Sequence, residues 1–194
     1  MPFRIRTLNA ISQVGLSRLP GDKYTVGHDV TSPDALLVRS ASLHNQPIEP
    51  SVLAVARAGA GTNNIPIAEF SKLGVPVFNT PGANANAVKE LVVAGLFLAA
   101  RNIVDAAAFA HRLEGDHATM DKLVEAGKKN YVGFELPGRT LGVIGLGAIG
   151  VEVANVALSL GMNVLGYDPG ITVQHAWALS SQVEHVTDLN ELLK

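Results

Sequence analysis

The segment Leu141-Gly142-Val143-Ile144-Gly145-Leu146-Gly147-Ala148-Ile149-Gly150 decides the fold of this chain. It contains the pattern Gly-x-Gly-x-x-Gly at Gly145, Gly147 and Gly150. The pattern alone has little specificity, but here a predicted strand, Thr140–Ile144, precedes it and a predicted helix, Ala148–Leu160, follows it. A strand, a glycine-rich turn and a helix in this order are typical of the first unit of a dinucleotide-binding fold.

Each glycine of the pattern has its own expected role. Gly145 permits the tight turn, Gly147 lets a pyrophosphate approach the backbone, and Gly150 lets the helix lie close to the strand. The helix amino terminus adds free N–H groups and a partial positive charge, and Ala148 and Ile149 belong to this first turn. We therefore expect these five residues to bind the cofactor.

An acidic residue supports the same interpretation. Asp168 follows the next predicted strand, Asn163–Tyr167, and lies 18 residues after Gly150. The acid that binds the adenosine ribose of NAD is expected about 20 residues on. A carboxylate there would repel the 2′-phosphate of NADP, so the spacing favours NAD. The alternative is a glycine-rich turn with an unrelated acid.

Three shorter elements complete this part of the chain. They are a helix at Gln174–Leu179, a strand at Val183–Val186 and a helix at Leu189–Lys194, capped by Asp188. Together with the glycine loop they predict the first half of a Rossmann nucleotide-binding domain over residues 138–194, with further strands needed to complete it.

The amino-terminal part predicts an α/β fold with an open parallel sheet. Apolar segments predict strands at Ile5–Leu8, Leu36–Arg39, Val52–Ala58 and Val75–Asn79. Helical spacing is found at Ser12–Leu19 and Pro66–Leu73. Alternating strands and helices favour a parallel sheet covered by helices, and we expect a substrate-binding domain over residues 1–99.

A helical connector is expected between the two domains. The break at Asn79-Thr80-Pro81-Gly82 is followed by an Ala-rich helical stretch, Ala85–Leu113, which Asn84 or Asn86 caps and Asn102 divides. The segment Glu114–Pro137 is more polar and contains three glycines. We place the connector over residues 100–137.

Composition excludes several classes of protein. Hydrophobic residues make up 47% of the 194 residues, the net charge is −2, and no run of Lys or Arg exceeds two, so neither a nucleic acid nor a membrane is expected as a partner. The absence of cysteine excludes disulfides, thiolate metal sites and a cysteine nucleophile. Met1–Asn9 lacks the apolar core of a secretory signal. The apolar run Leu91–Ala100 would span only about 15 Å as a helix, so we expect a buried helix and a cytoplasmic protein.

From Arg39 onward the sequence resembles the D-2-hydroxyacid dehydrogenases. The matching segments are, in order, Val38–Ser42, Arg57–Ile65, Val77–Gly82, Asn84 with Val88–Leu91, Gly138–Gly150 and Gly166–Pro169. The resemblance implies a substrate domain and an inserted nucleotide domain, with the active site between them. It also implies NAD-dependent oxidation of a small anionic D-2-hydroxy acid.

The resemblance assigns several residues to the substrate. They are Arg39, Ser40, Arg57, Ala58, Gly59 and Asn84, while Ala60 lies on the nicotinamide side. The chemistry agrees, because guanidinium groups bind carboxylate and phosphate with two hydrogen bonds, and the small residues 58–61 let backbone N–H groups reach an anion. Two arginines favour a doubly anionic substrate. Surface ion pairs for the arginines and simple helix capping for Asn84 remain the alternatives.

The chain departs from the family at the chemical step. The family's catalytic trio is an Arg, a Glu and a His in the later half of the nucleotide domain, and no matching segment occurs here, so no catalytic residue is assigned. None of the six histidines has the family position or metal-ligand spacing, and no Gly-x-Ser-x-Gly nucleophile segment is present. Two hypotheses remain: part of a dehydrogenase, or a non-catalytic NAD-binding or dimerisation module whose Ala-rich helices pair with a second subunit. Either is expected to form a homodimer or a larger homo-oligomer.

Overall fold

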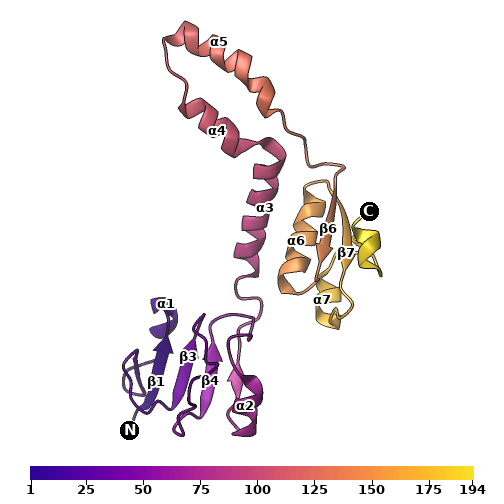
Figure 1. Ribbon diagram of the computed structural model, residues 1–194. Helices are drawn as coiled ribbons and strands as arrows, with labels where there is room; N and C mark the ends of the chain where they lie inside the picture. Colours follow the sequence, from indigo (N-terminus) through magenta and orange to yellow (C-terminus); the bar gives the residue numbers. More distant parts are fainter. The chain divides into compact units, whose positions relative to one another are not determined.

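The computed structural model describes all residues, Met1–Lys194, and is shown in Figure 1. The chain forms two compact units, Met1–Asn84 and Ala85–Lys194. The packing units therefore divide at the start of the long helix and not within residues 100–137, because that helix packs in the second unit. The functional domain limits 1–99, 100–137 and 138–194 stay a prediction, since they describe roles and not packing.

The first unit has one sheet of five parallel strands in the order β2-β1-β3-β4-β5. The strands are β1 (Phe3–Leu8), β2 (Tyr24–Gly27), β3 (Ala35–Val38), β4 (Ala54–Arg57) and β5 (Val77–Phe78), and the helices are α1 (Gln13–Leu16) and α2 (Ile67–Lys72). The predicted open parallel sheet is confirmed. β2 was not predicted, because its four residues include only one aliphatic side chain, Val26.

The core of this unit lies around the two central strands. Val38 of β3 and Val55 of β4 are fully buried and cluster with Phe70 of α2. The chain passes from β1 to the outer β2 and then returns to β3 on the other side of β1. The carboxyl ends of β1 and β3 therefore flank a topological switch point, the place where open α/β sheets bind ligands.

The second unit has a three-stranded parallel sheet in the order β6-β7-β8, which leaves β6 at one edge. Its strands are β6 (Thr140–Ile144), β7 (Asn163–Tyr167) and β8 (Glu184–His185), and its later helices are α6 (Ala148–Ser159), α7 (Val173–Ala178) and α8 (Leu189–Leu192). The bounds of β6 and β7 are as predicted. Asp188 caps α8 as expected, its Oδ1 accepting from the Asn190 amide at 2.9 Å.

Three α-helices and a short 3-10 helix precede this sheet. They are α3 (Ala85–Arg101), α4 (Ile103–His111), α5 (His117–Gly127) and η1 (Lys128–Tyr131). Asn102 divides α3 from α4 as predicted: it is left-handed with φ +49°, and its Nδ2 donates to the Val132 carbonyl at 3.0 Å. The helix α5 was not predicted, because its sequence is polar; Asp116 caps it by accepting from the Thr119 amide at 2.9 Å.

The apolar run of α3 is buried on one face only. Ala100 is buried, and Val92 and Leu96 pack against the same core as the fully buried Ala154 and Ala157 of α6. Leu91, Phe97 and Leu98 are exposed, so the expectation of a buried helix is correct for one face and wrong for the other. No single helix is long and apolar enough to cross a bilayer, and only the bent pair α3–α4 meets that test, by length and composition alone.

Candidate nucleotide and substrate sites

The glycine loop between β6 and α6 has the geometry that a close strand–helix turn requires. Gly145 has φ +87°, a conformation that side chains disfavour, and its amide donates to the Tyr167 carbonyl at 2.8 Å. A Cβ on Gly150 would lie 1.9 Å from the Gly145 carbonyl oxygen. The third glycine is therefore required by backbone contact, and the atom it approaches belongs to the turn itself.

The middle glycine leaves open space for a ligand. Gly147 is the N-cap of α6 with φ −75°, and a Cβ there would meet no atom within 4 Å. Ala148 and Ile149 form the first turn, where helical N–H groups have no partner inside the helix. An open approach to a helix amino terminus fits a pyrophosphate group. The residues present therefore fit NAD at this loop.

Asp168 holds the loop through its carboxylate. Oδ2 accepts from the Leu146 amide at 2.8 Å and Oδ1 accepts from the Gly170 amide at 2.8 Å. The sequence predicted a ribose contact and did not indicate this second role. Each carboxylate oxygen has two lone pairs, so both oxygens keep capacity for ribose hydroxyls.

The arginines assigned to substrate lie at the carboxyl ends of two neighbouring strands of the first unit, with Arg39 directly after β3 and Arg57 at the end of β4. Arg57 ends β4 and pairs with Val38, the residue before Arg39. Arg57 Nε donates to the Arg39 carbonyl at 3.0 Å. Neither guanidinium forms an ion pair within this unit, so the alternative of surface ion pairs finds no support there. The structure brings two uncompensated cations to the carboxyl edge of the sheet.

Three asparagines that the sequence did not single out hold the loops at this edge. Asn9 Oδ1 accepts from the amides of Ser40, at 3.1 Å, and Ala41. Asn64 Nδ2 donates to the Arg39 and Ala41 carbonyls at 3.3 and 2.7 Å, and Asn79 Nδ2 donates to Ala60 at 2.7 Å. The signal that marks them is their place at the end of predicted strands, directly after them or between them, where asparagine often bonds to backbone.

The small-residue loop differs from the expectation in one respect. The Ala58 amide donates to the Val38 carbonyl at 2.8 Å and the Gly59 amide to the Arg57 carbonyl at 3.0 Å. These two N–H groups are therefore engaged internally, while those of Ala60 and Gly61 donate to no backbone carbonyl. Asn84 is exposed and directly precedes α3.

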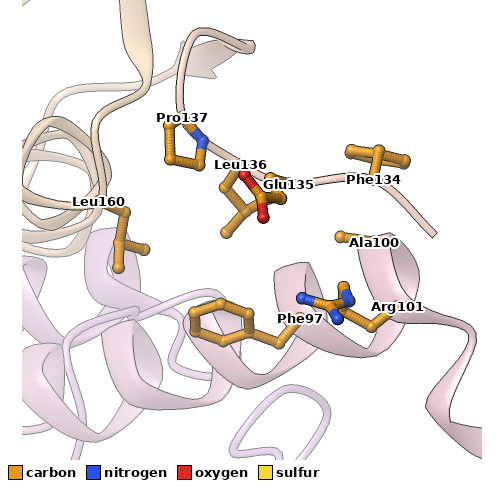
Figure 2. Close-up of a pocket in the computed structure, with 8 residues that line it drawn as sticks. All are labelled: Phe97, Ala100, Arg101, Phe134, Glu135, Leu136, Pro137 and Leu160. Carbon is orange, nitrogen blue, oxygen red and sulfur yellow. The ribbon is translucent and has the colours of Figure 1, made fainter.

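A groove in the second unit lies apart from the glycine loop. It has a volume of about 350 Å³ and is lined by Phe97, Ala100, Arg101, Phe134, Glu135, Leu136, Pro137 and Leu160 (Figure 2). A second hollow of about 720 Å³ shares Phe97, Arg101, Phe134 and Glu135 with it. No residue of the glycine loop lines either hollow, so we do not assign them to the nucleotide.

Comparison with known proteins decides the family. Residues 94–194, more than half of the chain, match the model of the D-isomer specific 2-hydroxyacid dehydrogenase NAD binding domain. The chain belongs to this family. The resemblance seen from Arg39 onward is thereby confirmed, as is the expectation of NAD at the level of the family.

Individual relatives support the same family assignment. The chain is 38% identical over 168 residues to a D-3-phosphoglycerate dehydrogenase of Methanocaldococcus jannaschii, covering 85% of this chain and 30% of that protein. It is 40% identical over 139 residues to a hydroxypyruvate reductase of Thermotoga maritima, covering 70% of this chain and 42% of that protein. The chain thus spans less than half the length of these family relatives.

Solved structures share the fold. An NAD⁺-bound 3-phosphoglycerate dehydrogenase of Entamoeba histolytica has a TM-score of 0.69 at 24% identity, covering 99% of this chain and 59% of that one. D-mandelate dehydrogenase of Rhodotorula graminis has a TM-score of 0.73 at 22% identity, covering 99% of this chain and 63% of that one. Dehydrogenases named for different substrates therefore share this fold.

Proposed function

We propose that this chain provides the NAD-binding loop and the substrate-binding arginines of a D-3-phosphoglycerate dehydrogenase. The reaction would oxidise D-3-phosphoglycerate to 3-phosphohydroxypyruvate, the entry step of serine synthesis. The observation that carries the proposal is the pair of arginines, Arg39 and Arg57, which lie at the carboxyl ends of adjacent strands and form no ion pair within their unit. Both arginines lie within Arg39 to Gly82, the first part of the sequence that resembles the family.

The charge of the substrate matches the site. D-3-phosphoglycerate carries a carboxylate and a phosphate, and a planar guanidinium can bond two oxygens of either group. A substrate with one anionic group would use one arginine. The alternative substrate is another D-2-hydroxy acid, and the similarity to a hydroxypyruvate reductase keeps that alternative open.

The cofactor would bind to the second unit. The amides at Gly147, Ala148 and Ile149 would hold the pyrophosphate, and Asp168 would bind the adenosine ribose. When bound, NAD supplies the hydride acceptor for the carbon that carries the substrate hydroxyl. The hydroxyl proton needs a general base, and the residues of this chain include none at the family's position for it.

Ligand titration of the 194-residue chain tests the proposal. Isothermal calorimetry should detect NAD binding that is tighter than NADP binding, and D-3-phosphoglycerate binding that is tighter than D-glycerate binding. Equal affinity for NAD and NADP would contradict the role of Asp168. Equal affinity for phosphoglycerate and glycerate would contradict the choice of a doubly anionic substrate.

We also propose that the groove of Figure 2 is a contact between two copies of the chain. Phe97 and Phe134 expose 41% and 46% of their surface there, and Arg101 and Glu135 place both signs of charge on its walls. In a two-fold contact the same patch faces itself, so each cation can meet an anion of the partner. This is the observation that favours a dimerisation role.

Sedimentation equilibrium tests the dimer. Phe97→Ser should lower the dimer fraction, while Val14→Ser, which changes a 79% exposed apolar residue of the first unit, should leave it unchanged. A wild-type chain that sediments as a monomer at all concentrations tested would refute the contact.

A further inference from the structure

The guanidinium of Arg57 is fixed at one end. Its Nε donates to the Arg39 carbonyl at 3.0 Å, and Arg57 is half-buried. A guanidinium has five N–H donors, so this bond leaves four for a ligand. Because the group is planar, the Nε bond also fixes the plane in which those four donors lie. Whatever holds the Arg39 carbonyl therefore affects the direction in which Arg57 presents its charge.

Asn64 holds that carbonyl. Its Nδ2 donates to the Arg39 carbonyl at 3.3 Å and to the Ala41 carbonyl at 2.7 Å. Its Oδ1 is buried and accepts no hydrogen bond. Leaving this buried oxygen unpaired is unfavourable. The two donations from Nδ2 are therefore the bonds that orient the side chain. Asn64 thus joins the loop after β3 to the acceptor that fixes Arg57.

Gly61 supplies the space that the guanidinium occupies. A Cβ on Gly61 would lie 2.7 Å from Arg57 Nη1, closer than real contacts allow, whereas a Cβ on Gly59 would lie 3.6 Å from Arg57 Cζ. The backbone of Gly61 is not left-handed, so an alanine there causes no backbone strain. The clash would fall on the flexible end of the arginine, which would have to turn away.

We propose that Gly61 and Asn64 are positioning residues that set the direction of the Arg57 guanidinium and thereby the preference for a doubly anionic D-2-hydroxy acid. The substrate part of this inference rests on the proposed function. The orientation part concerns this chain alone and holds with or without a ligand.

The orientation is tested first, without ligand. In ¹⁵N-labelled chain the Arg57 Nε–H signal should be protected from exchange with water because it is bonded to the Arg39 carbonyl. Gly61→Ala and Asn64→Ala should each shift this signal and speed its exchange. Gly21→Ala is the matched control, because Gly21 has open space around it and no left-handed backbone. An Arg57 signal that moves in neither variant overturns the proposal.

The consequence for binding is tested by a double-mutant cycle. Gly61→Ala should weaken D-3-phosphoglycerate binding about 10-fold or more, the range expected for loss of a charge-assisted hydrogen bond, and change D-glycerate binding much less. The same substitution on an Arg57→Ala background should have no further effect, because Gly61 acts through Arg57. Equal loss for both ligands, or a loss that persists without Arg57, would mean that Gly61 has a structural role only.

The two proposals fail in different ways. If the wild-type chain binds neither NAD nor a D-2-hydroxy acid, the proposed function fails, and the Arg57 signal still decides the orientation. If the wild type prefers phosphoglycerate but Gly61→Ala keeps that preference with the Arg57 signal unchanged, the positioning role fails and the proposed function stands.

Discussion

The Asp168 carboxylate accepts a hydrogen bond from the Leu146 amide at 2.8 Å, across the space between the end of β7 and the glycine loop. Leu146 is buried in the core of the second unit, so the bond connects a core residue with a polar strand end. The acid expected to bind ribose is therefore also a support of the loop expected to bind pyrophosphate. A substitution at Asp168 can act through either role, and the choice of substitution separates them.

Asp168→Asn and Asp168→Ala should differ in their effects. Asparagine keeps an oxygen acceptor for the Leu146 amide but removes the charge that repels a 2′-phosphate. It should reduce the preference for NAD over NADP with a smaller loss of thermal stability than alanine causes, because only the exposed Gly170 amide loses its acceptor. Alanine should reduce that preference too and should also lower stability by about 1–3 kcal/mol, because the amide loses its partner. Calorimetric titration with both nucleotides and thermal unfolding measure the two effects. Identical unfolding midpoints for the two variants would show that the bond to Leu146 contributes nothing.

Gly150→Ala and Gly147→Ala should separate packing from ligand space. The Gly150 Cβ would lie 1.9 Å from a backbone oxygen, so the loop must move and the second unit should be destabilised, by about 1–3 kcal/mol or more. The Gly147 Cβ meets no atom within 4 Å, so Gly147→Ala should keep the unfolding midpoint and lose NAD affinity. Gly95→Ala, also in open space, serves as the control for both measurements. A Gly147→Ala chain that binds NAD normally would place the pyrophosphate elsewhere.

Elements with a strong local pattern could be predicted from the sequence. The strands β6 and β7 have the predicted bounds, because each is a short apolar run limited by turn residues. The break at Asn102 was also predicted, since asparagine tolerates the left-handed conformation that ends α3. The three glycines specify a tight turn between a strand and a helix, so the loop at Gly145–Gly150 could be predicted from the sequence.

Features that depend on partners distant in sequence could not be predicted. Asn64 bonds to Arg39, which is 25 residues away, and Asn9 bonds to Ser40, which is 31 residues away. Nothing local to these asparagines indicates which loop they hold. The strand β2 escaped prediction for a similar reason: its pairing with β1 sustains it, and its own composition does not distinguish it from a loop.

Arg57→Ala should weaken binding of phosphoglycerate and leave NAD affinity unchanged. Loss of a charge-assisted hydrogen bond costs about 1.5–3 kcal/mol, roughly 10- to 150-fold in affinity. Arg18→Ala removes an exposed cation from the same unit and controls for the change in net charge. Calorimetry with each ligand provides the comparison. Unchanged phosphoglycerate affinity in Arg57→Ala would remove this residue from the site.

Acid should weaken the first unit through Asp34. The Arg4 amide donates to Asp34 Oδ2 at 2.7 Å, and this bond, followed by the Arg4 side chain, lowers the pKa of Asp34 below its ordinary value. Because the folded-state pKa is lowered, the stabilisation is present above the unfolded pKa of about 3.9 and is lost as pH falls through the folded pKa. Asp34→Asn should therefore be less stable than wild type at pH 7, and the difference should shrink below about pH 4. Urea unfolding at a series of pH values measures this, with the exposed Asp29→Asn as control. A difference that grows in acid would contradict the assignment.

The 194-residue chain by itself should bind ligands without turning them over. Oxidation of a 2-hydroxy acid requires a base for the hydroxyl proton, a contribution of about 10²- to 10⁴-fold, and a substrate held against the nicotinamide. From the resemblance to the family, we expect its catalytic Arg, Glu and His segments to have no counterpart in this chain. Formation of NADH from phosphoglycerate, followed by its absorbance, should not exceed the rate without protein. The positive control is a family member of full length under the same conditions. Turnover on the order of 1 s⁻¹ or faster by the purified chain would show that a base lies among its own residues, and the histidines would then be replaced one at a time to find it.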